Sequence, residues 1–283
     1  MQFVPMSELL RDAAEGGYAV PSFCVWSAEM MKVVLTTAER LKAPVILMNG
    51  PMEFRLLMPL EHGAVAHALA PLFSARAALH LDHGDSLERA EEAIRAGYTS
   101  VMLDFSTRPV EENIAAMKLV VEMARPHGIT VEGEIGVVGK VDDVTQEGGE
   151  EAGLTGADEA ADYVARTGVD ALVVAIGNAH GLYTKLPKLD FERLALLREA
   201  AGVPLVLHGG SGTPEEDLKR AISLGIVKVN IASDLNAAFR EALMEQWREG
   251  VNLWSPSAEA VAMESVVKVV ERWIRLTGAD GKA

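Results

Sequence analysis

Short apolar segments alternate with amphipathic segments along almost the whole chain. The apolar segments are five to seven residues long, are rich in β-branched residues and contain few polar positions. This pattern is typical of parallel strands that are buried on both faces. Eight segments are therefore expected as strands: Ala19–Val25, Pro44–Met48, Ala77–Asp82, Thr99–Asp104, Thr130–Glu134, Ala171–Ile176, Pro204–His208 and Ile226–Ile231.

The segments between these strands have the periodicity of helices with one buried face. Gly or Pro follows several of them and would end the helix there. Six are expected as helices: Ser27–Leu41, Ser86–Ala96, Val110–Ala124, Ala157–Thr167, Phe191–Ala200 and Pro214–Leu224. A seventh, Ala260–Leu276, has an apolar stripe that could cover the rest of the protein or contact another subunit.

Eight alternations of strand and helix in a chain of 283 residues predict an α/β fold of the TIM (β/α)8 barrel type. No linker, low-complexity tract or repeat interrupts the sequence, so we expect residues 1–283 to form a single barrel domain. A doubly wound sheet is the rival interpretation. It lacks support because no G-x-G-x-x-G follows the first strand.

The composition indicates which partners and which cellular compartment are to be expected for this barrel. With 41 acidic and 26 basic residues, the formal charge is -15, which argues against nucleic acid or an anionic membrane as a partner. The hydrophobic content of 49% is ample for a core without disulfides. The one cysteine, Cys24, and the lack of a signal-peptide pattern at the N-terminus predict a soluble protein in a reducing, cytoplasmic compartment.

Three of the seven histidines stand next to Gly where the chain leaves an apolar run: His83, His180 and His208. In a TIM barrel the carboxyl ends of the strands meet at one rim, where active sites form. Three imidazoles at that rim would leave one position of a zinc ion open to substrate. The sequence therefore predicts an open metal site there.

Four other polar residues fall on the same predicted rim. Asp82, Asp104 and Glu134 stand at the ends of the third, fourth and fifth strands, and Asn230 lies in the eighth. They would face the histidines across the barrel mouth. The alternative for Asp104 and Glu134 is that each only caps the helix that follows it.

The segment HGGSGTPEE after the seventh strand predicts an anion site. Thr213 is the expected N-cap and Pro214 the first helical residue, and Glu216, three residues after the cap, would complete a capping box. The glycines would then lead into a helix N-terminus, whose N–H groups can bind phosphate without a lysine. The alternative is a tight turn that needs Gly for positive φ, and the two interpretations are compatible.

Several motifs together resemble one family. They are HLDHG, AGYTSVMLDFS, VEGEIGVVG, AIGNAHGLY, PLVLHGGSGTPEEDLKRAISLGIVKVNIAS and the terminal GADGKA, in this order over nearly the whole chain. With them the sequence resembles the class II, metal-dependent ketose-bisphosphate aldolases. Ala232 in NIASDL is more similar to the tagatose-bisphosphate branch than to the main fructose-bisphosphate branch. The resemblance implies a TIM barrel, reversible cleavage of a ketose phosphate to dihydroxyacetone phosphate and an aldehyde, and a homodimer or homotetramer.

The resemblance also implies roles for individual residues. His83, His180 and His208 would bind one catalytic zinc ion, with Asp104 and Glu134 near it, and a monovalent cation is a further cofactor that the family allows. Asp82 would exchange a proton with the C4 hydroxyl, or, as the alternative, orient a histidine. The residues expected to hold the dihydroxyacetone phosphate part are Gly181, Gly209, Ser211, Asn230 and Ser233.

The chain departs from the family pattern around the substrate. Cys24 stands where relatives usually have Asn, and the loop GVVGKVDD replaces a G-G-x-E-D pattern. We expect the loop as far as Gly156 to be a mobile lid that carries a second acid/base, Asp142 or its neighbour Asp143. A solvated loop charge is the alternative.

The basic residues that hold a distal phosphate in bisphosphate-cleaving relatives are missing. Asn236 stands at one such place and Ser255–Ser257 at the other. A dianionic group without a charged partner loses its strongest hydrogen bonds. The sequence therefore predicts a substrate with an altered aldehyde end, unless Lys140, Arg108 or a neighbouring subunit supplies the charge.

Two other function classes fit parts of the pattern. A Schiff-base aldolase on this fold would use a lysine on a strand, and Lys228 qualifies by position, although three histidines would then be idle. A noncatalytic companion subunit would keep the barrel without the chemistry. The complete set of three histidines and Asp82 favours an enzyme.

Overall fold

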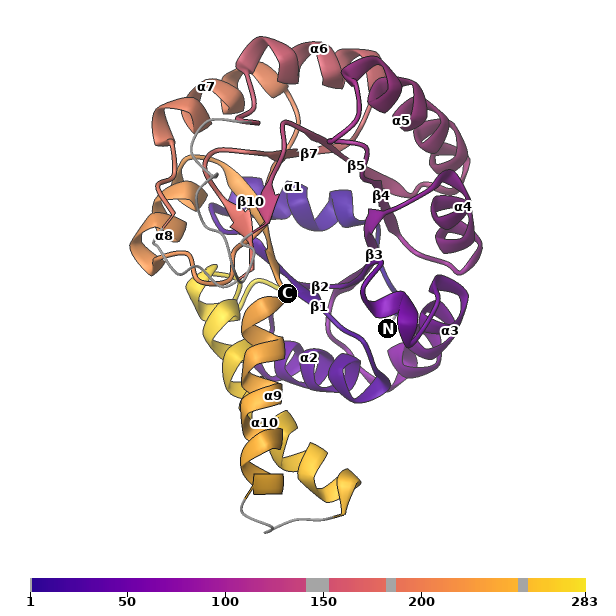
Figure 1. The fold of residues 1–283 in the computed structure, drawn as a ribbon, viewed down its shortest axis with the longest axis vertical. Helices are drawn as coiled ribbons and strands as arrows, with labels where there is room; N and C mark the ends of the chain where they lie inside the picture. The colour runs from indigo at the N-terminus through magenta and orange to yellow at the C-terminus, as the bar shows by residue number, and fades with distance from the viewer. Residues whose placement is uncertain (1, 141–152, 182–186, 249–253) are drawn as a thin grey trace.

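The computed structural model describes residues 2–140, 153–181, 187–248 and 254–283. Eight parallel strands form a closed barrel in the order β1-β10-β9-β7-β5-β4-β3-β2, with helices around it (Figure 1). The strands are β1 (Val20–Cys24), β2 (Val45–Asn49), β3 (Ala77–Gly84), β4 (Ser100–Leu103), β5 (Thr130–Ile135), β7 (Ala171–Val174), β9 (Leu205–Leu207) and β10 (Ile226–Ile231). Each lies in or overlaps one of the eight predicted segments, so the predicted TIM barrel is confirmed.

The outer helices follow the strands in turn. They are α2 (Ala28–Leu41), α3 (Pro59–Leu69), α4 (Leu87–Arg95), α5 (Val110–Ala124), α6 (Ala157–Thr167), α7 (Phe191–Ala201), α8 (Glu215–Ser223), α9 (Ser233–Arg248) and α10 (Ser255–Leu276), with short 3-10 turns at Glu53–Arg55, Ala70–Leu72 and Arg125–His127. Ser27 and Ser86 cap α2 and α4, because each hydroxyl accepts a hydrogen bond from a backbone N–H of the first turn. Within the described ranges, no helix is long and apolar enough to cross a membrane.

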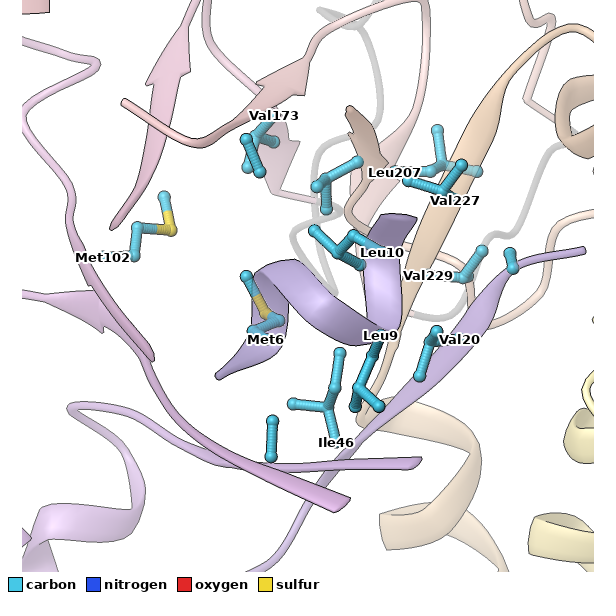
Figure 2. Packing of buried hydrophobic residues seen from close by; sticks show 14 of the residues in the cluster. Met6, Leu9, Leu10, Val20, Ile46, Met102, Val173, Leu207, Val227 and Val229 are labelled. Carbon is cyan, nitrogen blue, oxygen red and sulfur yellow. The ribbon is translucent and has the colours of Figure 1, made fainter. Parts of the chain in front are cut away.

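Helix α1 (Met6–Gly16), which the strand pattern did not predict, closes the amino end of the barrel. The N–H of Val4 donates to the carbonyl of Ala77 at the start of β3, and the N–H of Ser7 donates to the Thr130 hydroxyl at the start of β5. Figure 2 shows Met6, Leu9 and Leu10 lying among side chains of the strands. Each leucine is fully buried, which is worth about 2 kcal/mol per side chain.

Helices α9 and α10 lie side by side and extend away from the barrel (Figure 1). Near the barrel, α10 buries Val266, Val270 and Trp273. Farther out, Trp247 and Trp254 are 48% and 72% exposed. The predicted terminal helix is therefore confirmed, but it begins five residues earlier than Ala260 and only part of it covers the barrel.

Candidate active site

His83, His180 and His208 lie together at the carboxyl ends of the strands. Their ring centroids are 4.9 Å (His83–His180), 4.7 Å (His83–His208) and 5.6 Å (His180–His208) apart. One nitrogen from each ring lies within 4.8 Å of the corresponding nitrogens of the other two. The three residues are 125 positions apart at most in sequence, so it is the closed barrel that brings them together.

A break in β3 turns both Asp82 and His83 toward this cluster. Along a regular strand, neighbouring side chains point to opposite faces. Here the register with β4 shifts between Leu81 and Gly84, and His83 has φ 47°, in the left-handed region. This conformation is costly for a residue other than Gly, and it places the Asp82 carboxylate 4.0 Å from Nε2 of His83.

His180 reaches the rim on a short strand outside the barrel. The strand β8 (Ala179–His180) pairs in parallel with β6 (Gly139–Lys140). Asn178 ties this segment to the next ligand candidate: its Oδ1 accepts from the N–H of Ile176 at 2.8 Å, and its Nδ2 donates to the carbonyl of His208 at 2.9 Å. Sequence reasoning did not single out Asn178.

Asp104 fixes the orientation of His83. Its Oδ2 lies 2.7 Å from Nδ1 of His83, and its Oδ1 accepts from the N–H and hydroxyl of Ser106. Burial would raise the pKa of Asp104, but these hydrogen bonds outweigh it and hold that pKa below its ordinary value. Burial would lower the pKa of His83, yet Asp82 and Asp104 raise it to about 9. Nε2 of His83 is thereby left to face the cluster.

A second carboxylate, Glu132 on β5, plays the same part for His208. Nε2 of His208 lies 3.1 Å from Oε1 of Glu132, and the Lys228 ammonium bonds both oxygens of Glu132 at 2.8 and 2.9 Å. His80 lies beside Lys228 at 3.5 Å and places Nδ1 2.8 Å from the Ser100 hydroxyl. Burial holds the pKa of both His80 and His208 below the ordinary value, so both rings are neutral.

The geometry leaves Lys228 poorly suited to a Schiff base. The side chain is fully buried in the barrel, and its amine is engaged by Glu132 and His80. A nucleophilic amine must be unprotonated and open to a carbonyl carbon. Lys228 is instead one half of an interior ion pair.

Glu134 offers a further oxygen to the cluster. It is 2% exposed, and its Oε2 has no hydrogen-bond partner among the described residues. That oxygen lies 3.8 Å from Nδ1 of His208. Burial raises the pKa of Glu134 to about 8, with the Asp104 charge adding to the effect. A buried oxygen without a partner next to imidazole nitrogens is the kind of donor that a cation would satisfy.

Asp82 and Asn230 form a pair beside the histidines. Nδ2 of Asn230 donates to Oδ1 of Asp82 at 2.8 Å, while Oδ1 of Asn230 is buried without a partner among the described residues. Burial would raise the pKa of Asp82, but the electrostatic effect of the neighbouring His83, His208 and Lys228 side chains lowers it overall. Asp82 is therefore an ionised carboxylate that can accept a proton.

The glycine-rich segment after β9 differs from its predicted form. Helix α8 begins at Glu215 with Pro214 at the N-cap, and no side chain caps it. Thr213 is not the cap because its hydroxyl donates back to the carbonyl of Gly209, and Glu216 forms no capping box because its carboxylate pairs with Lys219. The predictions of Thr213 as N-cap, of Pro214 as first helical residue and of a capping box with Glu216 were therefore wrong.

The same segment meets a different helix N-terminus. The Ser211 hydroxyl accepts from the N–H of Asp234 at 3.1 Å, in the first turn of α9, which begins at Ser233. The segment is also joined to β10, since Gly210 donates to the carbonyl of Asn230. Ser211, Asn230 and Ser233 are thus brought close together, and Gly209 lies beside His180, next to Gly181.

Cys24 and Glu53 are in contact with each other near Asp82, and we refer to this pair as the wall next to Asp82. Cys24 is buried at the end of β1, and Glu53 accepts from the N–H of Gly50 at 2.9 Å. Burial raises the pKa of the Cys24 thiol, and its contact with Glu53 and the charge of Asp82 add to this effect. Arg108, the candidate for a distal charge, lies over the ring of Phe105 with the guanidinium carbon 4.5 Å from the centroid. Asp142 and Asp143 fall outside the described residues.

The fold and the site together define the protein as a barrel enzyme with an open cluster of imidazoles and carboxylates at the rim where TIM barrels act. The sequence model of class II fructose-bisphosphate aldolases matches residues 4–282. The chain therefore belongs to the class II fructose-bisphosphate aldolase family, and it is an aldolase, a carbon–carbon lyase.

Solved structures agree with this assignment. The YdjI aldolase from Escherichia coli K12 is similar to this chain at 36% identity and a TM-score of 0.89, with 100% of both chains covered. A candidate fructose-1,6-bisphosphate aldolase from Coccidioides immitis is similar at 28% identity and a TM-score of 0.88, over 98% of this chain and 97% of its own. A fructose-bisphosphate aldolase from Campylobacter jejuni, at 21% identity, a TM-score of 0.83 and coverage of 98% and 95%, shares the fold.

Proposed function

We propose that this aldolase uses one zinc ion to cleave a ketose phosphate reversibly into dihydroxyacetone phosphate and an aldehyde. The observation that carries the proposal is the meeting of His83, His180 and His208 beside the ionised carboxylate of Asp82. Zinc binds imidazole nitrogens and leaves a position open to substrate in sites of this kind.

The donor set suits zinc. His208 is neutral, His83 and His208 each have a carboxylate behind the ring, and the unpartnered Oε2 of Glu134 adds a carboxyl oxygen. Asp104 and Glu134 are the residues proposed to flank the ion. A bound zinc ion would supply Lewis-acid stabilisation of the negative charge that develops on the substrate oxygens at C2 and C3.

Asp82 is proposed to move the proton of the reaction. In the cleavage direction its carboxylate takes the proton of the C4 hydroxyl, the C3–C4 bond breaks to give the aldehyde, and the electron pair stays with the C2–C3 part. That part then takes up one proton at C3, which conserves protons overall. Asp142 is the residue we propose for this second transfer.

The dihydroxyacetone phosphate part is assigned to Gly181, Gly209, Ser211, Asn230 and Ser233. The contact of Ser211 with the first turn of α9 supports this assignment, since N–H groups at a helix N-terminus bind phosphate well. The unpartnered Oδ1 of Asn230 could accept a hydrogen bond from a substrate hydroxyl. These contacts do not depend on net charge and so fit a chain at -15.

For the aldehyde end we propose a group other than a second phosphate. The wall next to Asp82 contains Glu53 and the Cys24 thiol, and the Arg108 guanidinium is engaged by the Phe105 ring. An acidic wall disfavours a dianion. A ketose 1-phosphate, or a sugar phosphate with another distal group, is the substrate class we favour over tagatose or fructose 1,6-bisphosphate. We further expect a cytoplasmic homodimer or homotetramer.

The deciding experiment is a retro-aldol screen of ketose phosphates with zinc-loaded protein, in which released dihydroxyacetone phosphate is measured. Activity lost with EDTA and recovered with zinc would support the proposal. Trapping by borohydride in the presence of substrate would instead indicate a Schiff base at Lys228. Inactivity with every substrate and metal tested would identify a companion subunit.

A further inference from the structure

We infer that Glu132 and Lys228 are positioning residues that select Nδ1 of His208 as its metal-binding atom. The inference rests on the proposed zinc site. It concerns a buried pair in the barrel interior, below the rim, to which the proposed function gives no role in holding the metal.

The ion pair of Glu132 and Lys228 is hydrogen-bonded to the metal-site candidates through His208. Glu132 on β5 and Lys228 on β10 are both fully buried, and their ion pair crosses the barrel interior. Of the carboxylate's hydrogen bonds in the described structure, two come from Lys228 and one from Nε2 of His208 at 3.1 Å. Among the described residues, His208 is therefore the rim side chain to which Glu132 is hydrogen-bonded.

The hydrogen-bond donors and acceptors around His208 determine which of its ring nitrogens carries the proton. The Lys228 ammonium has three protons: two are directed to Glu132 and one to Nε2 of His80 at 3.5 Å. His80 must then carry its proton on Nδ1, which donates to the Ser100 hydroxyl at 2.8 Å. Both oxygens of Glu132 accept hydrogen bonds in its ion pair with Lys228, so Nε2 of His208 is the nitrogen that donates to Glu132 and carries the proton. Nδ1 is left with its lone pair, facing Nε2 of His83 at 2.9 Å.

His83 and His208 are thus each oriented by a carboxylate, but the carboxylates bond different ring nitrogens. Asp104 bonds Nδ1 of His83 and leaves Nε2 for the metal, whereas Glu132 bonds Nε2 of His208 and leaves Nδ1. Carboxylates that hold the far nitrogen of a ligand histidine fix its ring and raise its basicity. A buried ion pair is seldom better for stability than apolar side chains of similar size, so a purely structural role would not require these residues.

The first test uses the unaltered protein. Long-range proton–nitrogen NMR on ¹⁵N-histidine protein, with His208 assigned from the spectrum of His208→Asn, reports which ring nitrogen carries the proton. We expect His208 to be protonated at Nε2 without zinc and, with zinc, to show the Nδ1 shift of a bound nitrogen. Protonation at Nδ1, or zinc bound through Nε2, would overturn the inference.

The second test replaces the pair by apolar residues of similar size. We expect Glu132→Leu/Lys228→Met to fold, since neither charge is left alone, and yet to lack an acceptor for Nε2–H of His208. Its zinc Kd, measured by competition with a chromogenic chelator, should rise by about 10- to 100-fold. Arg76→Met is the matched control, because it removes an ion pair with Asp12 away from the rim, where α1 meets β3.

The outcomes separate the inference from the proposed function. If the wild-type protein binds no zinc, the proposed function fails. If the wild type binds zinc and the folded double variant binds it with a Kd within about threefold, the positioning role alone is refuted. A raised Kd in the double variant together with a wild-type Kd in Arg76→Met supports it.

Discussion

Gly209 lies against the backbone of Ala179, so that a Cβ atom on Gly209 would sit 2.0 Å from the Ala179 carbonyl oxygen. Ala179 precedes His180, and Gly209 follows His208. The close contact of these two backbones therefore sets the spacing of two of the three histidines.

Gly209→Ala should disturb this spacing. The new methyl group would push β8 and His180 outward, and a misplacement of about 1 Å at a catalytic group can cost ~10²-fold in rate. We expect a loss of this order in the cleavage rate and weaker zinc binding. Gly128→Ala is the control: φ is 65° there against 67° at Gly209, but a Cβ meets no atom within 4 Å. Equal losses in both variants would show that backbone strain, and not the contact, is responsible.

Replacing His83, His180 or His208 by Ala should each abolish stoichiometric zinc and activity. The three side chains lie at the carboxyl ends of the strands and His208 alone is fully buried, so the barrel, whose core consists of other residues, should remain folded by circular dichroism. Metal analysis after dialysis measures the effect. A variant that keeps one zinc per chain would remove that residue from the proposed ligand set.

Asp82→Ala should keep the metal but lose the chemistry. A positioned acid/base contributes roughly 10²- to 10⁴-fold, so the cleavage rate should fall by that factor. Asn230 loses its Asp82 partner in the variant, which makes Asn230→Ala the control for that bond. Metal loss in Asp82→Ala as large as in the histidine variants would favour the alternative role of orienting a ligand.

The substrate proposal is tested by comparing kcat/KM for tagatose or fructose 1,6-bisphosphate with that for the matching 1-phosphates. The acidic wall near Asp82 should give the bisphosphates no advantage. A bisphosphate preference of about 10²-fold or more, which is ~2.7 kcal/mol of transition-state binding, would contradict the proposal.

His62 should make stability depend on pH away from the rim. Its ring is buried under α3, with Nε2 3.1 Å from the carbonyl of Val25, and burial lowers its pKa to about 4. The unfolded chain binds this proton near pH 6.5, so it holds more protons than the folded chain between pH 4 and 6.5. Stability should therefore fall by about 3 kcal/mol from this group as pH drops through that window.

Urea unfolding of wild type and His62→Gln at several pH values measures this effect. The variant should lose that part of the pH dependence, whatever its stability at pH 7. His67→Gln, an exposed histidine on the same helix, is the matched control. The same slope in wild type and His62→Gln would be inconsistent with a buried neutral imidazole.

The barrel could be predicted because each strand carries its own signal. A strand such as Ala171–Val174 is apolar on both faces, and this can be seen in its sequence without knowledge of the neighbouring strands. The polar residues of the rim could be predicted because they stand at the ends of the expected strands. Helix α1 was not predicted because nothing in its sequence indicates that its apolar face packs into a barrel. Helix α3 was not predicted because it lacks a continuous apolar stripe.

The supporting contacts were harder to predict because they join residues that are distant in sequence. Lys228 stood out as the one charge in an apolar strand, but its partner Glu132 is 96 residues away. Thr213 had every local mark of an N-cap, yet its hydroxyl bonds Gly209 instead. Local patterns describe what a residue can do, and the tertiary fold selects among those options.

The closure of the barrel has a consequence for how the chain is made. β1 pairs with β10, and the N–H of Ala19 donates to the carbonyl of Thr277, so segments that are synthesised early complete their contacts with segments that are synthesised much later. Until then Met6, Leu9 and Leu10 lack much of their packing surface. Contacts so distant in sequence form slowly, and incomplete barrels expose apolar surface that aggregates. The arrangement that seals one end of the finished barrel thus leaves apolar surface of the growing chain uncovered until β10 has been made.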